Sequence, residues 1–473
     1  MVFSSSIFLL YFFPVFLVLY YLADKRFKNP IALVASIIFY AWGAPSFIFV
    51  VLGSVFLDFY IVKAMYTASP GARRWLLTAT IILNIGMLVY FKYMNFFVEN
   101  FNLVLSAFGA GALHWTKIAL PIGISFFTFQ KFTYSIDVFR GKHKPLDNPW
   151  DLCLYILLFP QLIAGPIVRY HEVADQIRDR SANETIDNRL LGFYRFVIGL
   201  AKKVLIANVM GAEADRIFAM QPADMSSATA WVGILAYTFQ IYFDFSGYSD
   251  MAIGIGRMIG FKFPENFNNP YISRSITEFW RRWHMTLGRW MRDYLYIPLG
   301  GNRVSAQWRL YFNLWVVFLI SGLWHGASWT FVVWGAYHGL FLILDRLFLL
   351  KFFEKIGKLP STLITFLLAI IGWVFFRSVD LQYAFDFIGR MFAFDFGGME
   401  YFDREFWAML AIAAAFSFLT AFRFGLNIEK RILYSNYTTA GYFIMALVVI
   451  VLLIICLASI TASGFNPFIY FRF

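Results

Sequence analysis

The sequence predicts an all-α, polytopic membrane protein, and three observations carry this prediction. Hydrophobic residues make up 60% of the 473 residues and charged residues only 14%, and the mean hydropathy is +0.64. Apolar runs recur along the chain at about the 20-residue length that a spanning helix needs. Basic residues gather in the short loops between these runs, as they do in membrane proteins. The composition excludes a soluble globule, a collagen, a coiled coil and a disulfide-rich scaffold.

The apolar runs predict roughly eleven or twelve transmembrane helices in one domain over residues 1–473. The first run lacks a basic start and a small-residue cleavage site, so we expect a retained span and not a signal peptide. Glycine and proline interrupt several runs, as at Pro121-Ile122-Gly123 and Ala164-Gly165-Pro166. Broken backbone at membrane depth is tolerated only where it is buried or lines a wet cavity, so we expect re-entrant or broken helices around a central channel. The runs lie near residues 7–22, 31–48, 49–66, 75–91, 95–110, 117–136, 151–168, 190–210, 229–260, 310–350 (longer than one span), 361–376, 406–422 and 437–461.

The basic residues also predict how the chain is oriented in the cytoplasmic (inner) membrane, because cytoplasmic loops carry the excess of lysine and arginine. Loops 24–29 and 67–74 are basic, whereas the turn Ala44-Pro45-Ser46 between them has no charge. This alternation places the N-terminus outside. At the other end, basic loops predict that the last span runs outward and that the short tail, 463–473, also emerges outside. The basic residues are Lys25, Arg26, Lys28, Arg73, Arg74, Lys351, Lys355, Lys358, Arg423, Lys430 and Arg431.

The net charge of +12 results from 40 Lys and Arg against 28 Asp and Glu. In a soluble domain this excess would suggest a nucleic-acid ligand, but here the basic residues belong to the loops. We therefore expect the lipid bilayer as a partner and no nucleic acid. Cys153 and Cys456 lie inside apolar runs without metal-ligand spacing, so we expect neither a disulfide nor a metal site.

A histidine, His325, lies between small residues inside an apolar stretch, in Trp324-His325-Gly326-Ala327. An ionisable group at membrane depth is costly and is therefore a functional hypothesis by default. Histidine can take a proton near neutral pH, and the flanking glycine would let a substrate approach the backbone. The structural alternative is a histidine whose nitrogens are tied to backbone carbonyls at a helix break. His338, further along, could face the same cavity, but a packing role with satisfied ring nitrogens is favoured.

Aromatic and basic residues also concentrate between Asn266 and Arg303. If residues 276–294 form one helix, apolar side chains make a single stripe along it, bordered by arginines. The structural alternative is an interfacial helix, whereas a functional use of the arginines is recognition of an anionic donor. The interfacial alternative does not account for His284 within the stripe or for the turn Gly300-Gly301-Asn302-Arg303. The stripe contains Trp280, Trp283, Leu287, Trp290 and Tyr294, and the arginines are Arg281, Arg282, Arg289 and Arg292.

Two carboxylates, Asp244 and Asp250, lie in the apolar run 229–260. Residues at this spacing share a helix face poorly, so acid and base catalysis on a sugar is the weaker hypothesis and a structural network or helix cap is favoured. No phosphate-binding loop, serine-esterase elbow, HExxH or dinucleotide-binding motif occurs, which excludes those enzyme classes.

These segments together resemble the membrane-bound O-acyltransferase family, and within it the bacterial branch of alginate O-acetylation proteins. The resemblance extends over residues 121–339, and the first residues and the aromatic tail are also similar. His325 matches the near-invariant intramembrane histidine of the family, and His284 matches the second histidine of this branch. The matching stretches are Pro121-Ile122-Gly123-Ile124-Ser125-Phe126, Phe159-Pro160-Gln161-Leu162-Ile163-Ala164-Gly165-Pro166, Asp244-Phe245-Ser246-Gly247-Tyr248-Ser249-Asp250, Phe279-Trp280-Arg281-Arg282-Trp283-His284, Trp324-His325-Gly326-Ala327 and Trp334-Gly335-Ala336-Tyr337-His338-Gly339.

The resemblance implies an O-acyltransferase that moves an acetyl group from a cytosolic donor across the membrane. The implied donor is acetyl-CoA or an acyl carrier, with no bound cofactor. The implied acceptor is an extracytoplasmic polysaccharide, alginate or a similar cell-surface polymer, and the implied partner is a periplasmic serine-type acetyltransferase. D-alanyl transfer to teichoic acid and a non-enzymatic membrane transporter are the alternatives.

The resemblance also implies roles for particular residues. His325 would take a proton from the attacking hydroxyl. His284 and Arg289 would orient the donor or stabilise the developing oxyanion, without an assignment of which residue does which. The expected substrate-binding residues are Trp280, Trp283, Arg289, Asn302 and Trp324.

The aromatic tail ends in Asn466-Pro467-Phe468-Ile469-Tyr470-Phe471-Arg472-Phe473. Chain ends are usually polar and poorly ordered, so a tail this apolar is expected to be docked. One reading is an aromatic anchor at headgroup depth. The tail is also similar to the aromatic motif of a small membrane peptide in the related D-alanyl system, whose tyrosine accepts the acyl group. By that resemblance, Tyr470 would be a catalytic acyl carrier fused to the enzyme.

Overall fold

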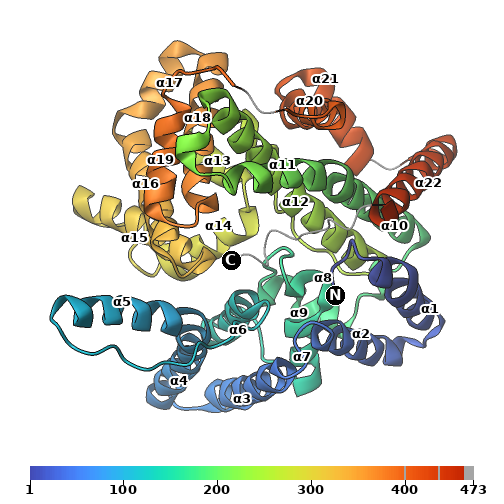
Figure 1. Cartoon of the computed structure of the whole chain (residues 1–473). Helices are drawn as coiled ribbons and strands as arrows, with labels where there is room; N and C mark the ends of the chain where they lie inside the picture. The colour runs from blue at the N-terminus through green and yellow to red at the C-terminus, as the bar shows by residue number, and fades with distance from the viewer. Residues whose placement is uncertain (399–400, 435–436, 463–473) are drawn as a thin grey trace. The chain divides into compact units, whose positions relative to one another are not determined.

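The computed structural model describes residues 1–398, 401–434 and 437–462 of the chain (Figure 1). Within these ranges the chain forms α-helices, short π-helical and 3₁₀ turns and no strand, so the all-α prediction is confirmed. The chain divides into two compact units. Unit 1 comprises Met1, residues 7–190 and residues 255–263, and unit 2 comprises residues 2–6, 191–254 and the chain from residue 264 onward. A single domain over residues 1–473 stays a prediction.

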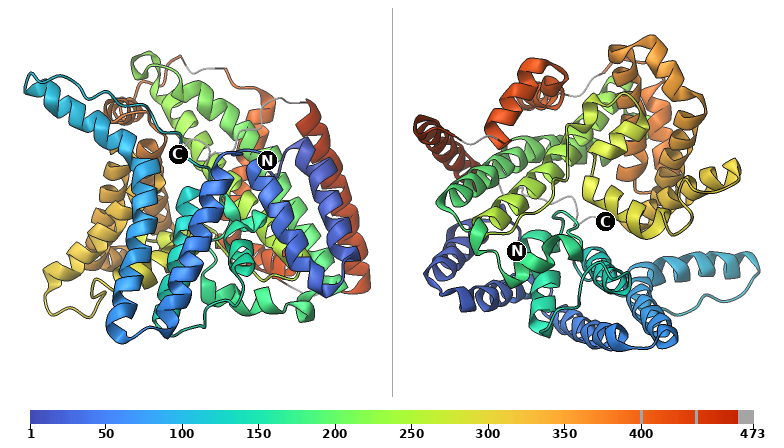
Figure 2. Two further views of the ribbon diagram at one scale, coloured as in Figure 1. Left: turned by 90° about the horizontal axis from the view of Figure 1, so that it is seen from below. Right: turned by 180° about the vertical axis from the view of Figure 1, so that it is seen from behind.

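Unit 1 is built from the N-terminal helices. In it α3, α4 and α6 lie side by side, and α5 extends away from them (Figure 2). Helix α10 (Ile186–Ala201) leads from unit 1 into unit 2. The helices of unit 1 are α1 (Phe13–Leu22), α2 (Lys25–Ala41), α3 (Phe47–Thr67), α4 (Pro70–Leu88), α5 (Met94–Ala107), α6 (Ile124–Phe139), α7 (Pro149–Leu157), α8 (Phe159–Leu162) and α9 (Tyr170–Arg178).

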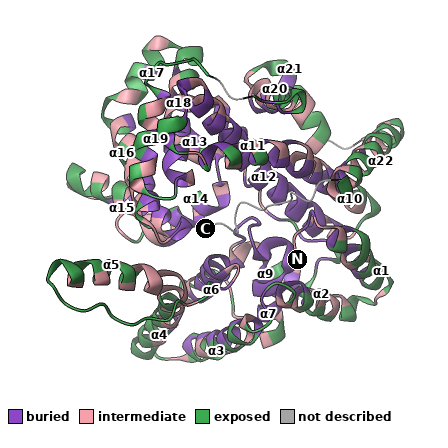
Figure 3. Cartoon of the chain, viewed as in Figure 1, coloured by how far each residue is buried: buried purple, intermediate pink, exposed green. Residues whose placement is uncertain are grey.

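Unit 2 contains the longest helix, α12, except for its residues 255–258, which belong to unit 1. Helix α12 is buried over almost its whole length, whereas α22 is mostly exposed (Figure 3). The helices of unit 2 are α11 (Asn208–Phe218), α12 (Ser227–Met258), α13 (Ile276–Arg282), α14 (Met285–Met291), α15 (Gln307–His325), α16 (Trp329–Leu344), α17 (Leu350–Ile356), α18 (Lys358–Arg377), α19 (Leu381–Met391), α20 (Arg404–Phe418), α21 (Arg423–Glu429) and α22 (Thr439–Ala462).

Six helical segments in the described ranges are long and apolar enough to cross a membrane. They are Phe47–Thr67, Pro70–Ala107, Trp329–Ile356, Lys358–Arg377, Arg404–Ala421 and Thr439–Ala462, and a shorter apolar helix covers Phe8–Leu22. Other expected spans coincide with helices that are shorter or carry more polar residues, such as α6, α7 and α12. The multi-pass prediction is confirmed, and the total of eleven or twelve spans stays a prediction.

The two breaks expected from glycine and proline are both present in unit 1. Gly123 has a φ of 77°, and α6 begins directly after it. A Cβ on Gly123 would lie 2.9 Å from the carbonyl oxygen of Leu162, and a Cβ on Gly165 would lie 2.6 Å from the Cα of Gln161. Glycine is needed at these two positions because backbone segments approach each other there. The predicted breaks at these two positions are therefore confirmed, whereas their arrangement around a central channel stays a prediction.

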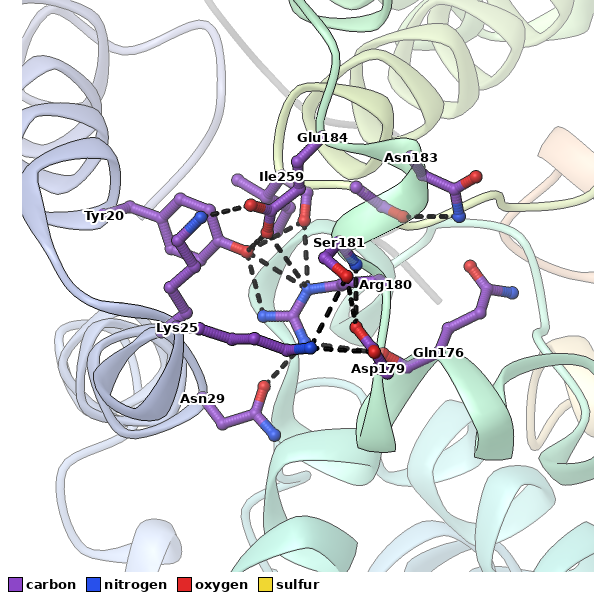
Figure 4. Close-up of polar contacts among 12 residues, drawn as sticks. Tyr20, Lys25, Asn29, Gln176, Asp179, Arg180, Ser181, Asn183, Glu184 and Ile259 are labelled. Carbon is purple, nitrogen blue, oxygen red and sulfur yellow. Dashed lines mark hydrogen bonds and ion pairs between the residues drawn. The ribbon is translucent and has the colours of Figure 1, made fainter.

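A buried guanidinium holds the first helices of unit 1 to the segment after α9 (Figure 4). Arg180 donates to the Tyr20 hydroxyl at 2.9 Å and to the Asn29 side-chain oxygen at 2.6 Å. The Tyr20 hydroxyl donates to the carbonyl oxygen of Ile259 at 2.9 Å. Lys28 pairs with Glu184, and both side chains are largely buried. A buried cation requires partners of this kind, so the cluster fixes the chain segments around it.

In unit 2, α15 and α16 form a closely packed hairpin. A Cβ on Gly322 would lie 2.2 Å from the Phe331 carbonyl oxygen, and one on Gly335 would lie 2.4 Å from the Phe318 carbonyl oxygen. The missing side chains let the two backbones touch, as small residues do between membrane helices. The apolar run 310–350, expected to exceed one span, is thus two helices with a break at residues 326–328.

Candidate active site

The site begins at a break in the segment that was expected to be one helix over residues 276–294. That prediction is wrong, because α13 ends at Arg282 and α14 starts at Met285, with His284 between them at φ 44° and ψ 52°. A loop that begins at residue 264 pairs with the backbone groups that would otherwise form the hydrogen bonds of a continuous helix. Asn268 donates its backbone N–H to the Arg282 carbonyl at 2.9 Å, and Met285 donates to the Asn266 carbonyl at 2.9 Å.

A pocket of about 530 Å³ opens beside this break within unit 2. Its volume is in the range of small-molecule sites. Aliphatic and aromatic side chains make most of its wall, and His284, Tyr296 and three arginines supply the charged and titratable groups. The lining residues are Thr277, Trp280, Arg281, His284, Met285, Leu287, Gly288, Arg289, Met291, Arg292, Tyr296, Leu314, Val317, Phe318, Ser321 and Leu342.

His284 is almost completely buried, although it lines the pocket. Its Nδ1 lies 3.0 Å from the side-chain oxygen of Asn266, and its ring meets Phe245 edge to face at 4.7 Å between centroids. Its Nε2 has no hydrogen-bond partner among the described residues. Burial lowers the pKa of His284 from 6.5 to about 3, because a desolvated imidazolium is unfavourable. His284 is therefore neutral at physiological pH.

His325 lies at the C-terminal end of α15, inside a cage of aromatic rings. Its ring centroid is 4.9 Å from that of Trp324, 5.2 Å from Trp334 and 5.1 Å from Phe376. His325 is buried and is not among the pocket-lining residues, but Trp324 contacts both histidines, with its centroid 6.0 Å from that of His284. The two predicted catalytic histidines thus flank one tryptophan.

The glycine beside His325 has a different use from the one expected. A Cβ on Gly326 would lie 2.1 Å from the Phe331 ring. Gly326 therefore makes room for that ring and not for a substrate at the backbone, so that expectation is wrong. The reason is that the chain turns back at residues 326–328 and brings the first turn of α16 against the end of α15.

Trp280 connects the pocket to the aromatic cage. It lines the pocket, and its ring centroid lies 5.4 Å from that of Trp334 and 5.0 Å from that of His338. His338 is fully buried, and neither of its ring nitrogens has a hydrogen-bond partner in the described part of the chain. The burial fits a packing role, but the unpaired ring nitrogens do not fit the satisfied histidine that was expected, because buried polar groups are normally hydrogen-bonded.

The other predicted site residues are spread more widely. Arg289 lines the pocket and donates to the Glu265 carbonyl at 3.2 Å. Trp283 is buried and does not line the pocket; its ring centroid lies 4.8 Å from that of Trp373, which lies 5.5 Å from that of Phe376 in the aromatic cage. Asn302 is exposed and accepts a hydrogen bond from the Tyr296 hydroxyl at 2.6 Å. Tyr470 lies outside the described residues.

The two carboxylates of α12 take part in separate ion pairs. Asp244 lies 3.0 Å from the Lys203 ammonium. Asp250 lies 2.9 Å from Arg195 and 2.7 Å from Lys202. These pairs fit the structural network that the spacing favoured. In the described ranges, no group of three His, Cys, Asp or Glu residues is placed to hold a metal ion.

Two residues that shape the pocket were not named from the sequence. Asn266 lies within hydrogen-bond distance of His284, and Ser321 lines the pocket wall. Asn266 begins the aromatic and basic segment that the sequence singled out, so its position was a signal. Its contact with His284 depends on the helix break, which the spacing of the apolar residues did not predict.

Comparison with known proteins agrees with this architecture. The profile described as MBOAT, membrane-bound O-acyltransferase family, matches residues 142–378, which include both histidines of the site. The chain is 46% identical over 397 residues to the "Probable alginate O-acetylase AlgI" of Pseudomonas aeruginosa, covering 83% of this chain and 75% of that protein. It is 41% identical over 491 residues to the protein of the same name from Pseudomonas putida, covering 100% of both. It is also 39% identical over 420 residues to the "Peptidoglycan O-acetyltransferase" of Helicobacter pylori, covering 81% of this chain and 78% of that protein. This chain therefore belongs to the membrane-bound O-acyltransferase family.

Proposed function

We propose that this enzyme takes an acetyl group from a cytosolic donor and delivers it across the cytoplasmic membrane for O-acetylation of an extracytoplasmic polysaccharide. The observation that carries the proposal is the pocket of unit 2, where His284 and three arginines share one cavity. Relatives that match four fifths or more of the chain are named as acetylases or acetyltransferases of alginate or peptidoglycan, and these names support an acetyl group as the group transferred and a polysaccharide as the acceptor. Alginate or a similar surface polymer is the proposed acceptor.

The arginines suit an anionic acyl donor. Guanidinium groups bind phosphate oxygens through paired hydrogen bonds, and Arg281, Arg289 and Arg292 lie on the pocket wall. Acetyl-CoA and an acyl-carrier protein both present phosphate. The apolar lining, including Trp280 and Phe318, suits the uncharged arm that carries the acyl group.

The chemistry is an acyl transfer in which His325 acts as general base. His325 takes the proton of the attacking hydroxyl while the oxygen bonds to the thioester carbonyl carbon. The carbon–sulfur bond then breaks, and the proton passes to the leaving thiolate. The aromatic rings around His325 exclude water from this step, which limits hydrolysis of the donor.

The hydroxyl that attacks first is proposed to be that of Tyr470 in the C-terminal tail. The tail is expected outside, where the acyl-tyrosine would pass its acetyl group to a periplasmic serine-type acetyltransferase. This relay would solve a physical problem, because neither a hydrophilic polymer nor a phosphorylated donor can enter the hydrocarbon core. It divides one transfer into two covalent steps.

The first experiment replaces His325 by Ala and by Gln and measures polymer acetylation together with membrane abundance. We expect both variants to lose acetylation at wild-type abundance. The control is His114→Ala, because His114 is exposed in a loop of unit 1, and this variant should acetylate normally. Retained acetylation in the His325 variants at normal abundance would remove His325 from the mechanism. Transfer from a D-alanyl carrier, with none from an acetyl donor, would favour the teichoic acid alternative.

A second experiment tests the tail. Tyr470→Phe keeps the aromatic ring and removes only the hydroxyl, so we expect it to stop polymer acetylation without reducing insertion. Labelled donor should mark the tail peptide of the wild type alone. Full activity of the Phe variant would leave the tail only an anchoring role.

A further inference from the structure

The position of His284 is set by a loop that precedes it in the chain. Asn266 is buried, and its carbonyl accepts the backbone N–H of Met285 at 2.9 Å. Its side chain faces the first turn of α14, where it contacts His284 and Thr286. One asparagine therefore holds both the backbone and the ring at the break.

The hydrogen bonds of the Asn266 amide fix which of its atoms faces the histidine. The Asn266 amide nitrogen donates to the Ser249 hydroxyl at 3.0 Å. The amide oxygen accepts from the Thr286 hydroxyl at 2.8 Å and from the Thr286 backbone N–H at 3.4 Å. A backbone N–H can only donate, so the atom facing Thr286 is the oxygen. This same oxygen lies 3.0 Å from His284 Nδ1.

The tautomer of His284 follows from this orientation. An amide oxygen is an acceptor, so the Nδ1 facing it must carry the hydrogen. In a neutral imidazole the other nitrogen then carries a lone pair and no hydrogen. Nε2 is thus an acceptor, on a residue that lines the pocket.

We propose that Asn266 is a positioning residue that holds His284 in the tautomer whose Nε2 is a hydrogen-bond acceptor. This inference rests on the proposed acyl transfer and refines it. A neutral His284 with hydrogen on Nδ1 has no hydrogen on Nε2 to offer to a developing oxyanion. Of the two roles open to His284, orienting the donor by accepting one of its hydrogen bonds therefore remains.

The charges around the pocket favour the same state. The charged groups that line it with His284 are Arg281, Arg289 and Arg292, and no carboxylate is among the lining residues. With no carboxylate there to stabilise it, a desolvated imidazolium is unfavourable, and burial lowers the pKa of His284. Asn266 is itself uncharged, so it orients the ring without promoting protonation, as a carboxylate in its place would.

Nitrogen NMR of the full-length protein labelled with ¹⁵N-histidine tests the tautomer without any assay of activity. His284→Gln identifies the His284 signals. We expect a protonated Nδ1 and an unprotonated Nε2 at neutral pH in the wild type, and loss of this pattern in Asn266→Leu. A protonated Nε2 in the wild type would overturn the proposal.

Kinetics test the effect on the reaction. We expect Asn266→Leu to lower kcat roughly 10- to 100-fold, the range for loss of a group that orients a histidine ligand, with little change in KM for the donor. Asn313→Leu is the matched control, because Asn313 is equally buried in unit 2 but donates to the Leu299 carbonyl at 3.2 Å and contacts no histidine. Equal kcat values for the two variants, measured per folded molecule, would contradict the role of Asn266.

The conservative variant Asn266→Asp separates positioning from simple structure. Asn266→Asp keeps a hydrogen-bond acceptor for Nδ1, so at pH 8 it should have most of the activity that Asn266→Leu loses. Its carboxylate stabilises the protonated ring of His284. As the pH is lowered, the variant should therefore lose activity at a higher pH than the wild type does. An unchanged pH profile would contradict the proposal. If the wild type transfers acetyl from no donor, the proposed function fails, and the NMR measurement still decides the tautomer.

Discussion

Two histidines with different surroundings are the residues that we propose to carry the chemistry. His284 lines the pocket and is held by an amide, whereas His325 is enclosed by rings. The sequence pointed to His325 because an ionisable group among apolar residues is costly, and to His284 because an interfacial helix does not account for it and the family resemblance includes it. It could not tell which histidine lines the pocket, because that depends on a loop eighteen residues before His284.

The buried His284 predicts a specific loss of stability in acid. Its folded pKa of about 3 lies below the ordinary 6.5, so below pH 6.5 the unfolded chain binds a proton that the folded chain does not. This contribution to stability is complete above pH 6.5 and is lost as the pH falls toward 3. When the pH is lowered from 7.5 to 5, the free energy of unfolding of His284→Gln should fall by about 2 kcal/mol less than that of the wild type. Denaturation in detergent at the two pH values measures this difference, and an equal loss in both proteins would show that His284 is not held neutral.

Arg289 should act on the donor. Arg289→Ala removes a charged hydrogen-bond donor from the pocket wall, which is worth about 1.5–3 kcal/mol, so KM for the donor should rise roughly 10- to 100-fold at normal abundance. Arg289→Lys keeps the charge without the planar fork and should recover part of the affinity. Arg303→Ala is the control, since Arg303 is exposed and does not line the pocket. A fall in abundance alone would support the interfacial-anchor alternative.

Helices and their breaks decide where these residues meet. The sequence predicted the breaks at Gly123 and Gly165 from glycine and proline, and both are present. It missed the break at His284, because the apolar periodicity of Trp280, Trp283 and Leu287 continues across it. Hydrogen bonds from the loop of Asn266 and Asn268 produce that break, and such long-range contacts override local periodicity.

The α15–α16 hairpin supplies a prediction about packing. In Gly335→Ala the new methyl would lie 2.4 Å from the Phe318 carbonyl oxygen. Overpacking of this kind costs about 1–3 kcal/mol, so the melting temperature should fall. Gly389→Ala is the control, because no atom lies within 4 Å of its added Cβ, and it should be neutral or slightly stabilising. Equal melting temperatures for the two variants would show that the hairpin can separate at little cost.

At the scale of the whole molecule, the hydropathy of the chain and the positions of its basic loops determine which architecture the sequence predicts. They were sufficient to predict an all-α, multi-pass membrane protein, because the bilayer permits few architectures. The division into two units was not predicted, since it depends on contacts between distant segments. The orientation of the chain stays a prediction that rests on the positions of lysine and arginine.

Cysteine labelling tests this orientation. Cys153 and Cys456 are both buried and can be replaced by Ser to give a background without reactive thiols. In that background Ser46→Cys should react with an impermeant maleimide added outside intact cells, because cytoplasmic loops carry the basic residues. Arg26→Cys and Lys358→Cys should react only after the membrane is opened. All three positions are exposed, and the reverse pattern would invert the topology.

The most direct test of the central claim is transfer of labelled acetyl across sealed, inverted membrane vesicles that hold the polysaccharide pathway. The donor, acetyl-CoA or an acetylated carrier, is added on the cytoplasmic side, and label on the enclosed polymer is measured. We predict that wild-type vesicles acetylate the polymer and that His325→Ala vesicles, matched for enzyme content, do not. Equal labelling in both, or no labelling in the wild type with either donor, would contradict the account.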